Sequence, residues 1–385
     1  MAGAPTTTPG NALALLTRSQ KIILALAIGL SILAGILTFA HANEVLIFIL
    51  AGAALAFLAA VVGEATEQVG ARLSPGATGI LQSTIGNLPE LFVAIFALRA
   101  GLLVVVQTSL IGSILGNSLL VLGLAFFVGG VRHGTQTFSS HLPRMIATLT
   151  LLAVAALVIP TFTAFLHTPA SGHEDQLSLA AAIVLLIVYA GSIPLSLSGG
   201  PTALPKPPEL EEEERADTQA MQQAPKSEER HIAWPLWLAI TLLTISGVGA
   251  ALVSDWFVEA LTPATEALGI SEAFTGLVIV ALAGNAVEHF VGVQLAAKNK
   301  SDYAVSVILN SSLQIALALI PALVIISLLP GLTHLTLVLS PLLVVAVGLA
   351  AILGAVIVFD GESNWLEGLA LMGLYVIIAV SFWWG

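Results

Sequence analysis

The chain of 385 residues is 57% hydrophobic and only 9% charged, with a formal net charge of −11 and no cysteine. Soluble globular domains carry about 25% charged residues, so this composition excludes a soluble protein of this length. The absence of cysteine excludes disulfides and thiolate metal sites, and without a basic stripe nucleic-acid binding is not expected.

Apolar stretches that are long enough to cross a bilayer recur along the whole chain. A spanning helix needs roughly 20 mostly apolar residues. The first stretch lacks a small-residue cleavage site, so we expect a retained span and not a signal peptide. The sequence therefore predicts an all-α polytopic membrane protein, embedded in a lipid bilayer, with eleven transmembrane helices. They cover about 21–40, 44–71, 76–99, 101–129, 143–166, 177–198, 233–258, 272–297, 302–328, 332–359 and 364–384.

The lysine and arginine residues predict the orientation of these spans. With a cytoplasmic N-terminus, eleven of the twelve basic residues fall on the inner side and only Arg99 falls outside. The positive-inside rule therefore predicts a cytoplasmic N-terminus and, with eleven spans, an external C-terminus.

A hydrophilic segment at 199–232 divides the chain. Between residues 209 and 230 it holds eight acids and three basic residues, which predicts an acidic cytoplasmic linker. Five spans lie on each side of it, and an odd number inverts the second set, as in many secondary transporters. We expect an N-terminal tail and first helix at 1–43, then two inverted five-helix repeats at 44–198 and 233–385.

A repeated motif supports the two halves. The first half contains TGILQSTIGNLPELF and the second contains TGLVIVALAGNAVEHF, each on the second span of its half. Asn87 and Asn285 are therefore equivalent, as are Glu90 and Glu288. Carboxylates inside a span are costly and usually functional. We expect Glu90 and Glu288 to meet near the membrane midplane.

The motif also predicts a locally opened helix. Gly86 and Gly284 weaken the helix just before each glutamate, and Pro89 removes a backbone donor in the first copy. Carboxylate, amide and carbonyl oxygens would then line one pocket. Such hard ligands suit Ca²⁺, and protons compete with a bound cation for the same carboxylates.

Polar side chains on the following spans are further candidates for this pocket. Ser113 and Asn117 share one face of the fourth span, and Ser311 and Gln314 lie on the ninth. They would ligate the ion, orient its ligands or simply bond to neighbouring helices.

Three other titratable residues are candidates for the ion pathway. Glu67 and Asp255 are predicted near span ends, on opposite sides of the membrane, as attractors of cations or as simple interfacial charges. His289 adjoins Glu288 but points about 100° away on a helix, so it would modulate proton release or merely pack.

The repeated motifs and the segments around them resemble those of the calcium/proton antiporters, the cation exchanger branch of the calcium/cation antiporter superfamily. The matching segments are LQSTIGNLPEL (81–91), VVQTSLIGSILGNSLLVLG (105–123), GLVIVALAGNAVEH (276–289) and NKSDYAVSVILNSSLQIAL (299–317). The resemblance implies that Glu90 and Glu288 bind Ca²⁺ and carry protons, assisted by Asn87, Asn285 and Gln314. The sequence departs from the family pattern at Pro89, at Asn310 where glycine is usual, and at Asp255 where glutamate is usual.

The expected function is Ca²⁺/H⁺ exchange, with Ca²⁺ as transported substrate and no organic cofactor. A Na⁺/Ca²⁺ exchanger or another divalent cation/proton antiporter is the alternative, and a passive channel is a third class. No hydrolase motif supports an enzyme. The compact loops suggest a prokaryotic plasma membrane, with a vacuolar membrane as the alternative.

Overall fold

The protein is mostly helical in the residues that its computed structural model describes, which are 15–73, 81, 85–139, 141–197 and 234–385. The acidic linker at 199–232 lies outside this described part. The first half contains α1 (Arg18–Phe39), α2 (Glu44–Gly70), α4 (Leu88–Arg99), α5 (Leu103–Leu115), the π-helix η2 (Gly116–Val121), α6 (Leu122–His133), α7 (His141–Phe165) and α8 (Glu174–Leu197). The second half contains α10 (Leu236–Leu268), α11 (Glu272–Phe274), the π-helix η3 (Thr275–Val280), α12 (Ala281–Gly284), α13 (Ala286–Ala297), α14 (Ser301–Gln314), the π-helix η4 (Ile315–Leu319), α15 (Ile320–Ile326), α16 (Pro341–Ile357) and α17 (Trp365–Ser381).

Most of these helices are apolar enough for a bilayer. Within the described residues, seven helices are long enough to cross it, or eight if the bent pair around Asn285 is one span. Two shorter apolar helices, α16 and α17, follow. The polytopic all-helical membrane fold is thus confirmed, and the count of eleven spans with two inverted repeats stays a prediction.

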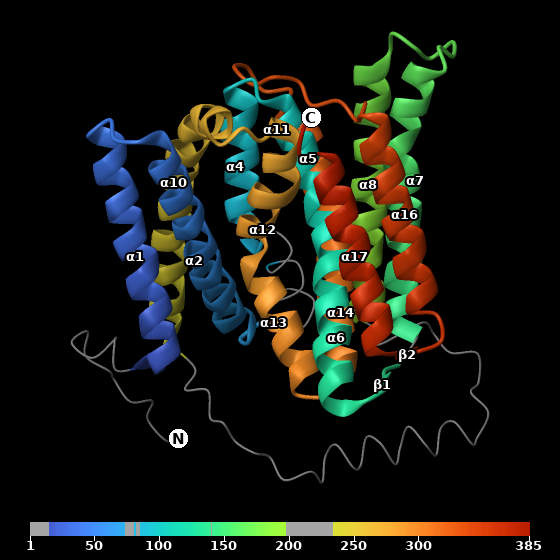
Figure 1. Cartoon of the computed structure of the whole chain (residues 1–385), viewed down its shortest axis with the longest axis horizontal. Helices are drawn as coiled ribbons and strands as arrows, with labels where there is room; N and C mark the ends of the chain where they lie inside the picture. Colours follow the sequence, from blue (N-terminus) through green and yellow to red (C-terminus); the bar gives the residue numbers. More distant parts are fainter. Residues whose placement is uncertain (1–14, 74–80, 82–84, 140, 198–233) are drawn as a thin grey trace.

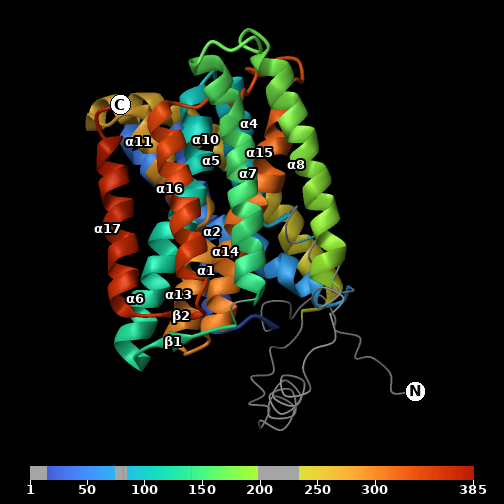
Figure 2. The same cartoon turned by 90° about the vertical axis from the view of Figure 1, so that its right-hand side faces the viewer.

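The helices form a bundle in which α1, α2 and α10 lie together at one side (Figure 1). α2 packs along α10, and α1 covers α2. The middle of the bundle holds α4, α5, α12, α13 and α14, and the other side holds α7, α8 and α16, as both views show (Figure 2). A short antiparallel pair, β1 (Gln136–Thr137) with β2 (Glu362–Ser363), joins two loops at one end.

Burial separates central from peripheral helices. Only 17% of the apolar windows of α1 and α8 is buried, against 72% for Leu103–His133 and Ser301–Ile326. Large side chains on the peripheral helices, such as Ile36 and Ile187, are exposed. Lipid is the natural environment for such an apolar outer surface.

Two glycines bring α5 and η3 into close contact. A Cβ on Gly112 would lie 2.7 Å from the Leu277 Cα, and a Cβ on Gly276 would lie 2.7 Å from the Val105 carbonyl oxygen. Small residues at a crossing let two membrane helices approach closely. This contact places the second copy of the motif beside α5, which carries Ser113.

The tenth predicted span, 332–359, begins too early. The helix α16 starts at Pro341, and an extended segment at 333–339 precedes it. Leu335, Leu337 and Leu339 point inward and are buried. Hydropathy does not distinguish buried extended chain from helix, whereas proline at the first helical position does mark where the helix begins.

The seventh predicted span, 233–258, ends too early. Helix α10 continues to Leu268 and carries Pro263 inside it. Asp255 therefore lies well within a helix, and its predicted position near the helix end is wrong. The acids and the proline end the apolar run, but charged residues such as Glu259 and Glu266 still form helix beyond it.

Candidate functional site

Both copies of the repeated motif interrupt a helix at the asparagine. Helix α12 ends at Gly284, Asn285 has φ −105° and ψ 17°, and the two flanking helices are bent by 65°. In the first copy Asn87 has φ −93° and ψ 17°, directly before α4. The predicted break of the helix is therefore confirmed in the second copy. In the first copy α4 begins directly after Asn87, and most of residues 75–84 lie outside the described part.

The two glutamates lie in the first turns of the helices that follow these breaks. Glu90 is in the first turn of α4 and is 2% exposed, and Glu288 is in the first turn of α13 and is half-buried. The two motifs lie close together, because Gly284 of the second copy adjoins Glu90 of the first. Helix N-termini favour anionic groups, so both breaks present a suitable field for a carboxylate.

Gly284 allows this approach. A Cβ at that position would lie 3.4 Å from the Glu90 Cβ and 3.8 Å from its carboxyl carbon. The glycine of the second copy therefore adjoins the glutamate of the first copy, which brings the two motifs together.

Ser113 on α5 connects the two motifs by hydrogen bonds. Its hydroxyl donates to Oε1 of Glu90, and it accepts a hydrogen bond of 2.9 Å from the Asn285 amide. The same amide donates to the Ala281 carbonyl at 3.0 Å. These bonds occupy the Asn285 amide nitrogen, whereas its carbonyl oxygen Oδ1 has no hydrogen-bond partner among the described residues.

Two further hydrogen-bonded pairs of side chains join η2 to α14. Asn117 donates to the Ser311 hydroxyl at 2.9 Å, and the hydroxyls of Ser118 and Ser312 are 3.1 Å apart. Both pairs are separated by 194 residues. Each residue therefore meets its counterpart from the other half.

Several buried oxygen atoms of this cluster have no hydrogen-bond partner among the described residues. They are Oε2 of Glu90, Oδ1 of Asn117 and Oδ1 of Asn285. A buried polar atom without a partner is costly and marks a functional position. The described residues hold no group of three or more acidic or histidine side chains around a metal position, so neutral oxygens must complete any coordination.

The remaining predicted residues are distributed around this centre. Asn87 is buried, and Gln314 is half-buried at the end of α14. His289 points to η2, since a Cβ on Gly116 would lie 3.9 Å from its ring, and its Nε2 has no hydrogen-bond partner among the described residues. Glu67 in the last turn of α2 and Asp255 within α10 are exposed.

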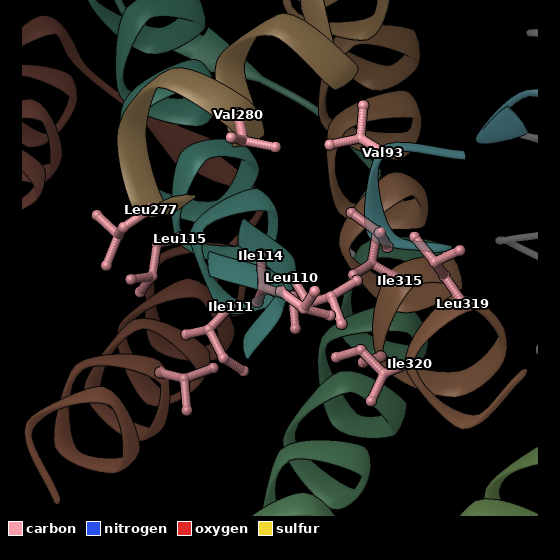
Figure 3. Packing of buried hydrophobic residues seen from close by; sticks show 14 of the residues in the cluster. Val93, Leu110, Ile111, Ile114, Leu115, Leu277, Val280, Ile315, Leu319 and Ile320 are labelled. Atoms are coloured by element: carbon pink, nitrogen blue, oxygen red, sulfur yellow. The ribbon is translucent and has the colours of Figure 1, made fainter. Parts of the chain in front are cut away.

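Buried apolar side chains of the same helices belong to one packed cluster. Figure 3 shows Leu277 of η3 beside Leu115, and Leu110 and Ile114 of α5 near Ile315 of η4. These side chains are nearly inaccessible to solvent. Low polarity around the site strengthens its electrostatic interactions.

A known protein family matches the sequence in both halves of the chain. The family described as "Sodium/calcium exchanger protein" matches residues 43–197 and 238–384. The chain belongs to this family.

Relatives of this exchanger are calcium/proton antiporters. It is 38% identical to the "Ca(2+)/H(+) antiporter" of Aphanothece halophytica over 89% of this chain and 91% of that protein. It is 34% identical to "Ca(2+)/H(+) antiporter ChaA" of Bacillus subtilis over 94% and 97% of the two chains. The structure of native YfkE is similar with a TM-score of 0.77 at 32% identity, covering 94% and 99%. The resemblance to calcium/proton antiporters is thereby confirmed.

Sequence reasoning missed part of the exchanger's polar cluster. Ser118, Ser312 and the Ala281 carbonyl take part in it and were not predicted. The sequence did contain an indication for the two serines, because they occupy equivalent positions in IGSILGNSLLVLG and VSVILNSSLQIAL.

Proposed function

We propose that this exchanger moves Ca²⁺ in one direction and protons in the other, with Glu90 and Glu288 shared by both ions. One observation carries the proposal. Glu90 lies against Gly284 of the second motif, four residues before Glu288, among buried oxygen atoms that have no partner in the described residues. The relatives' printed names, Ca²⁺/H⁺ antiporter, support the same pair of ions.

The chemistry of the cluster suits a hard cation. Ca²⁺ takes 6–8 oxygen ligands at about 2.3–2.6 Å in flexible geometry. Glu90 and Glu288 supply carboxylates, and Asn87, Asn117 and Asn285 supply amide oxygens. Ser113, Ser311 and Gln314 supply further oxygens or orient the other ligands. The interrupted helices add carbonyl groups that lack a full set of intrahelical bonds.

Proton coupling follows from charge. Two adjacent carboxylates in a nonpolar region repel each other unless a cation or protons neutralise them. Release of Ca²⁺ therefore favours proton uptake on the same groups. Alternating access requires that the empty, doubly negative site does not change sides, and the cost of moving uncompensated charge supplies that restriction.

The topology is part of the proposal. We place the N-terminus in the cytoplasm and the C-terminus outside, because eleven of twelve basic residues then lie inside. Two inverted repeats at 44–198 and 233–385 are supported by the contacts between equivalent residues. Glu67, Asp255 and His289 are assigned to the ion pathway. The proposed location is a prokaryotic plasma membrane, with a vacuolar membrane as the alternative.

Glutamine substitutions test the shared site. Glu90→Gln and Glu288→Gln keep the shape of each side chain and remove its charge and its titrating proton. Each variant is reconstituted in Na⁺-free vesicles with an imposed pH gradient, and Ca²⁺ uptake is measured. We expect wild-type protein to accumulate Ca²⁺ as protons run down their gradient, and both variants to lose coupled uptake while remaining folded.

Three results contradict the proposal. Full coupled exchange by either variant removes the glutamate from the mechanism. Uptake that requires Na⁺ and ignores the pH gradient makes the protein a Na⁺/Ca²⁺ exchanger. Uptake independent of both gradients makes it a channel.

A further inference from the structure

A stripe of polar side chains runs along one face of α14. Tyr303, Ser306, Asn310 and Gln314 are three or four residues apart in succession, so they share this face. Tyr303 is 59% exposed, Asn310 is exposed, and the other two are half-buried. We refer to these four residues as the α14 stripe; it runs from the helix N-terminus toward Ser311.

The α14 stripe does not face the bilayer in the manner of a peripheral helix. α14 packs against α6, α7, α13 and η2, and lies in a span whose apolar window is 72% buried. The opposite face of α14 is buried through residues such as Ala304, Ile308 and Ser312. A lipid-exposed asparagine in the middle of a span is costly, which favours water within the protein over lipid as the neighbour of the stripe.

The equivalent face of the first half is closed. The 194-residue offset of the paired residues relates Tyr303, Ser306 and Asn310 to Ser109, Gly112 and Gly116. Ser109 is 3% exposed, and Gly112 lies against the Leu277 backbone. Gly116 is buried next to His289. The two halves therefore differ: the α14 face is open and the α5 face is packed.

We propose that the α14 stripe is the entrance through which Ca²⁺ reaches Glu90 and Glu288 from the end of α14 at Ser301, with Asn310 binding the cation in transit. This inference rests on the proposed function. Hydroxyl and carboxamide oxygens replace water ligands one at a time, and Asn310, being neutral, binds without trapping the ion. The positive-inside rule assigns this end to the cytoplasm.

Cysteine labelling tests the entrance independently of transport. The chain has no cysteine, so a single introduced thiol is the only reactive one. Ser306→Cys and Asn310→Cys are exposed in sealed vesicles to a membrane-impermeant methanethiosulfonate reagent, added to each side in turn, with and without Ca²⁺. Ser109→Cys is the matched control, because Ser109 is buried and bonds to the Val106 carbonyl of its own helix.

We expect both stripe variants to be modified from the Ser301 side and Ca²⁺ to slow modification of Asn310→Cys. Ser109→Cys should stay unmodified from that side. The proposal is overturned if the stripe variants resist the reagent on the Ser301 side, or if Ca²⁺ leaves the rate at Asn310→Cys unchanged.

Transport provides a second measurement. Asn310→Leu removes one neutral oxygen ligand and should raise the KM for Ca²⁺ about tenfold, the effect of losing one ordinary polar contact. The increase should appear only when Ca²⁺ is supplied on the Ser301 side. Thr244→Val is the control, since Thr244 is exposed on α10 and bonds to the Ile240 carbonyl in its own helix. An equal increase on both sides places Asn310 in the central site and contradicts its role in the entrance.

The two hypotheses fail separately. If labelling and protection occur as expected but uptake is driven by Na⁺, the entrance stands and only proton coupling is wrong. If coupled Ca²⁺/H⁺ exchange is found but the stripe is inaccessible, the exchange stands and the entrance is wrong.

Discussion

Ser113 is the residue that connects the two halves of the exchanger at the site by hydrogen bonds. It is fully buried and bonds to Glu90 from the first half and to Asn285 from the second. A side chain bonded to both motifs sets the distance between them. Its loss should therefore disturb the arrangement of the ligands more than the fold.

We predict that Ser113→Ala weakens Ca²⁺ binding. One hydrogen bond to a charged group and one to an amide are lost, which is about 2–3 kcal/mol by the usual magnitudes, or roughly 30- to 150-fold in affinity. The KM for Ca²⁺, determined in vesicles, measures this loss of affinity. Ser109→Ala, on the same helix with its hydroxyl bonded to the Val106 carbonyl, should change the KM by less than about threefold. Equal effects of both substitutions contradict a specific role for Ser113.

The shared carboxylates give a pH dependence with a definite sign. Protons and Ca²⁺ compete for Glu90 and Glu288, so a lower pH occupies the carboxyl groups with protons and must weaken apparent Ca²⁺ binding. We expect the KM for Ca²⁺ to rise as pH falls, and either glutamine variant to flatten this dependence. Binding measured at several pH values, with proton release followed in weakly buffered solution, checks it. An affinity that is independent of pH contradicts the shared site.

At the scale of residues, the sequence predicted the paired glutamates but not every partner. The repeat alone indicated that Glu90 and Glu288 are equivalent. It did not indicate that Ser113 faces Glu90, because hydrogen-bond partners depend on how helices rotate about their axes. It misplaced Asp255, because the end of a span was judged from apolar residues and α10 continues beyond them.

Among the elements, the extended segment at 333–339 is held by side chains of three helices. Gln107 of α5 donates to the Thr336 and Val338 carbonyls, both at 3.0 Å. Thr161 of α7 donates to the Leu337 carbonyl and accepts from the Leu339 amide, and Ser178 of α8 accepts from the Leu337 amide. Buried non-helical backbone within a membrane protein needs such partners.

We predict that Thr161→Val destabilises the protein. The shape is kept, but one buried carbonyl and one buried amide lose their partner, at a cost of about 1–3 kcal/mol each. Thermal unfolding in detergent should show a clear decrease in the midpoint. Thr244→Val removes a hydroxyl that bonds within its own exposed helix face and should leave the midpoint nearly unchanged. Equal midpoints for the two variants show that the segment does not depend on Thr161.

The sequence predicted the regular helices better than the extended segment and the π-helices. Spans such as α1 and α2 were found within a few residues, since apolar length is sufficient to recognise them. The extended segment was taken as helix because its residues are equally apolar. Between the Thr-Gly and Gly-Asn pairs the second motif is one residue longer than the first, and η3, a π-helical turn, lies there. A π-helix accommodates such an insertion, but the sequence did not indicate it.

For the whole molecule, composition and repetition indicated the class of protein strongly, because both are global properties of the chain. Counting apolar stretches and basic residues predicts eleven spans and their orientation. The described residues contain seven helices that are long enough to span a bilayer, or eight with the bent pair, so the count and the orientation stay predictions. The packing of α1, α2 and α10 at one side could not be predicted, since all three are apolar around most of their circumference.

The linker at 199–232 tests the topology. It is hydrophilic and lies between the two predicted repeats, on the cytoplasmic side if the N-terminus is inside. We predict that protease added to sealed vesicles cuts the chain within 199–232 only when the cytoplasmic face is accessible. Right-side-out and inverted vesicles, compared by the size of the fragments, provide the measurement. Cleavage from the opposite side only reverses the assigned orientation.

The pairs Asn117–Ser311 and Ser118–Ser312 also concern the origin of the molecule. A residue that meets its own equivalent is what a two-fold axis produces between identical chains. A single five-helix protein, inserted in both orientations, would make these contacts with a second copy of itself. After gene duplication and fusion, the two residues of each pair could mutate independently. The two pairs differ in how far this has gone. Ser118 and Ser312 are still identical, whereas Asn117 and Ser311 have become a donor and an acceptor.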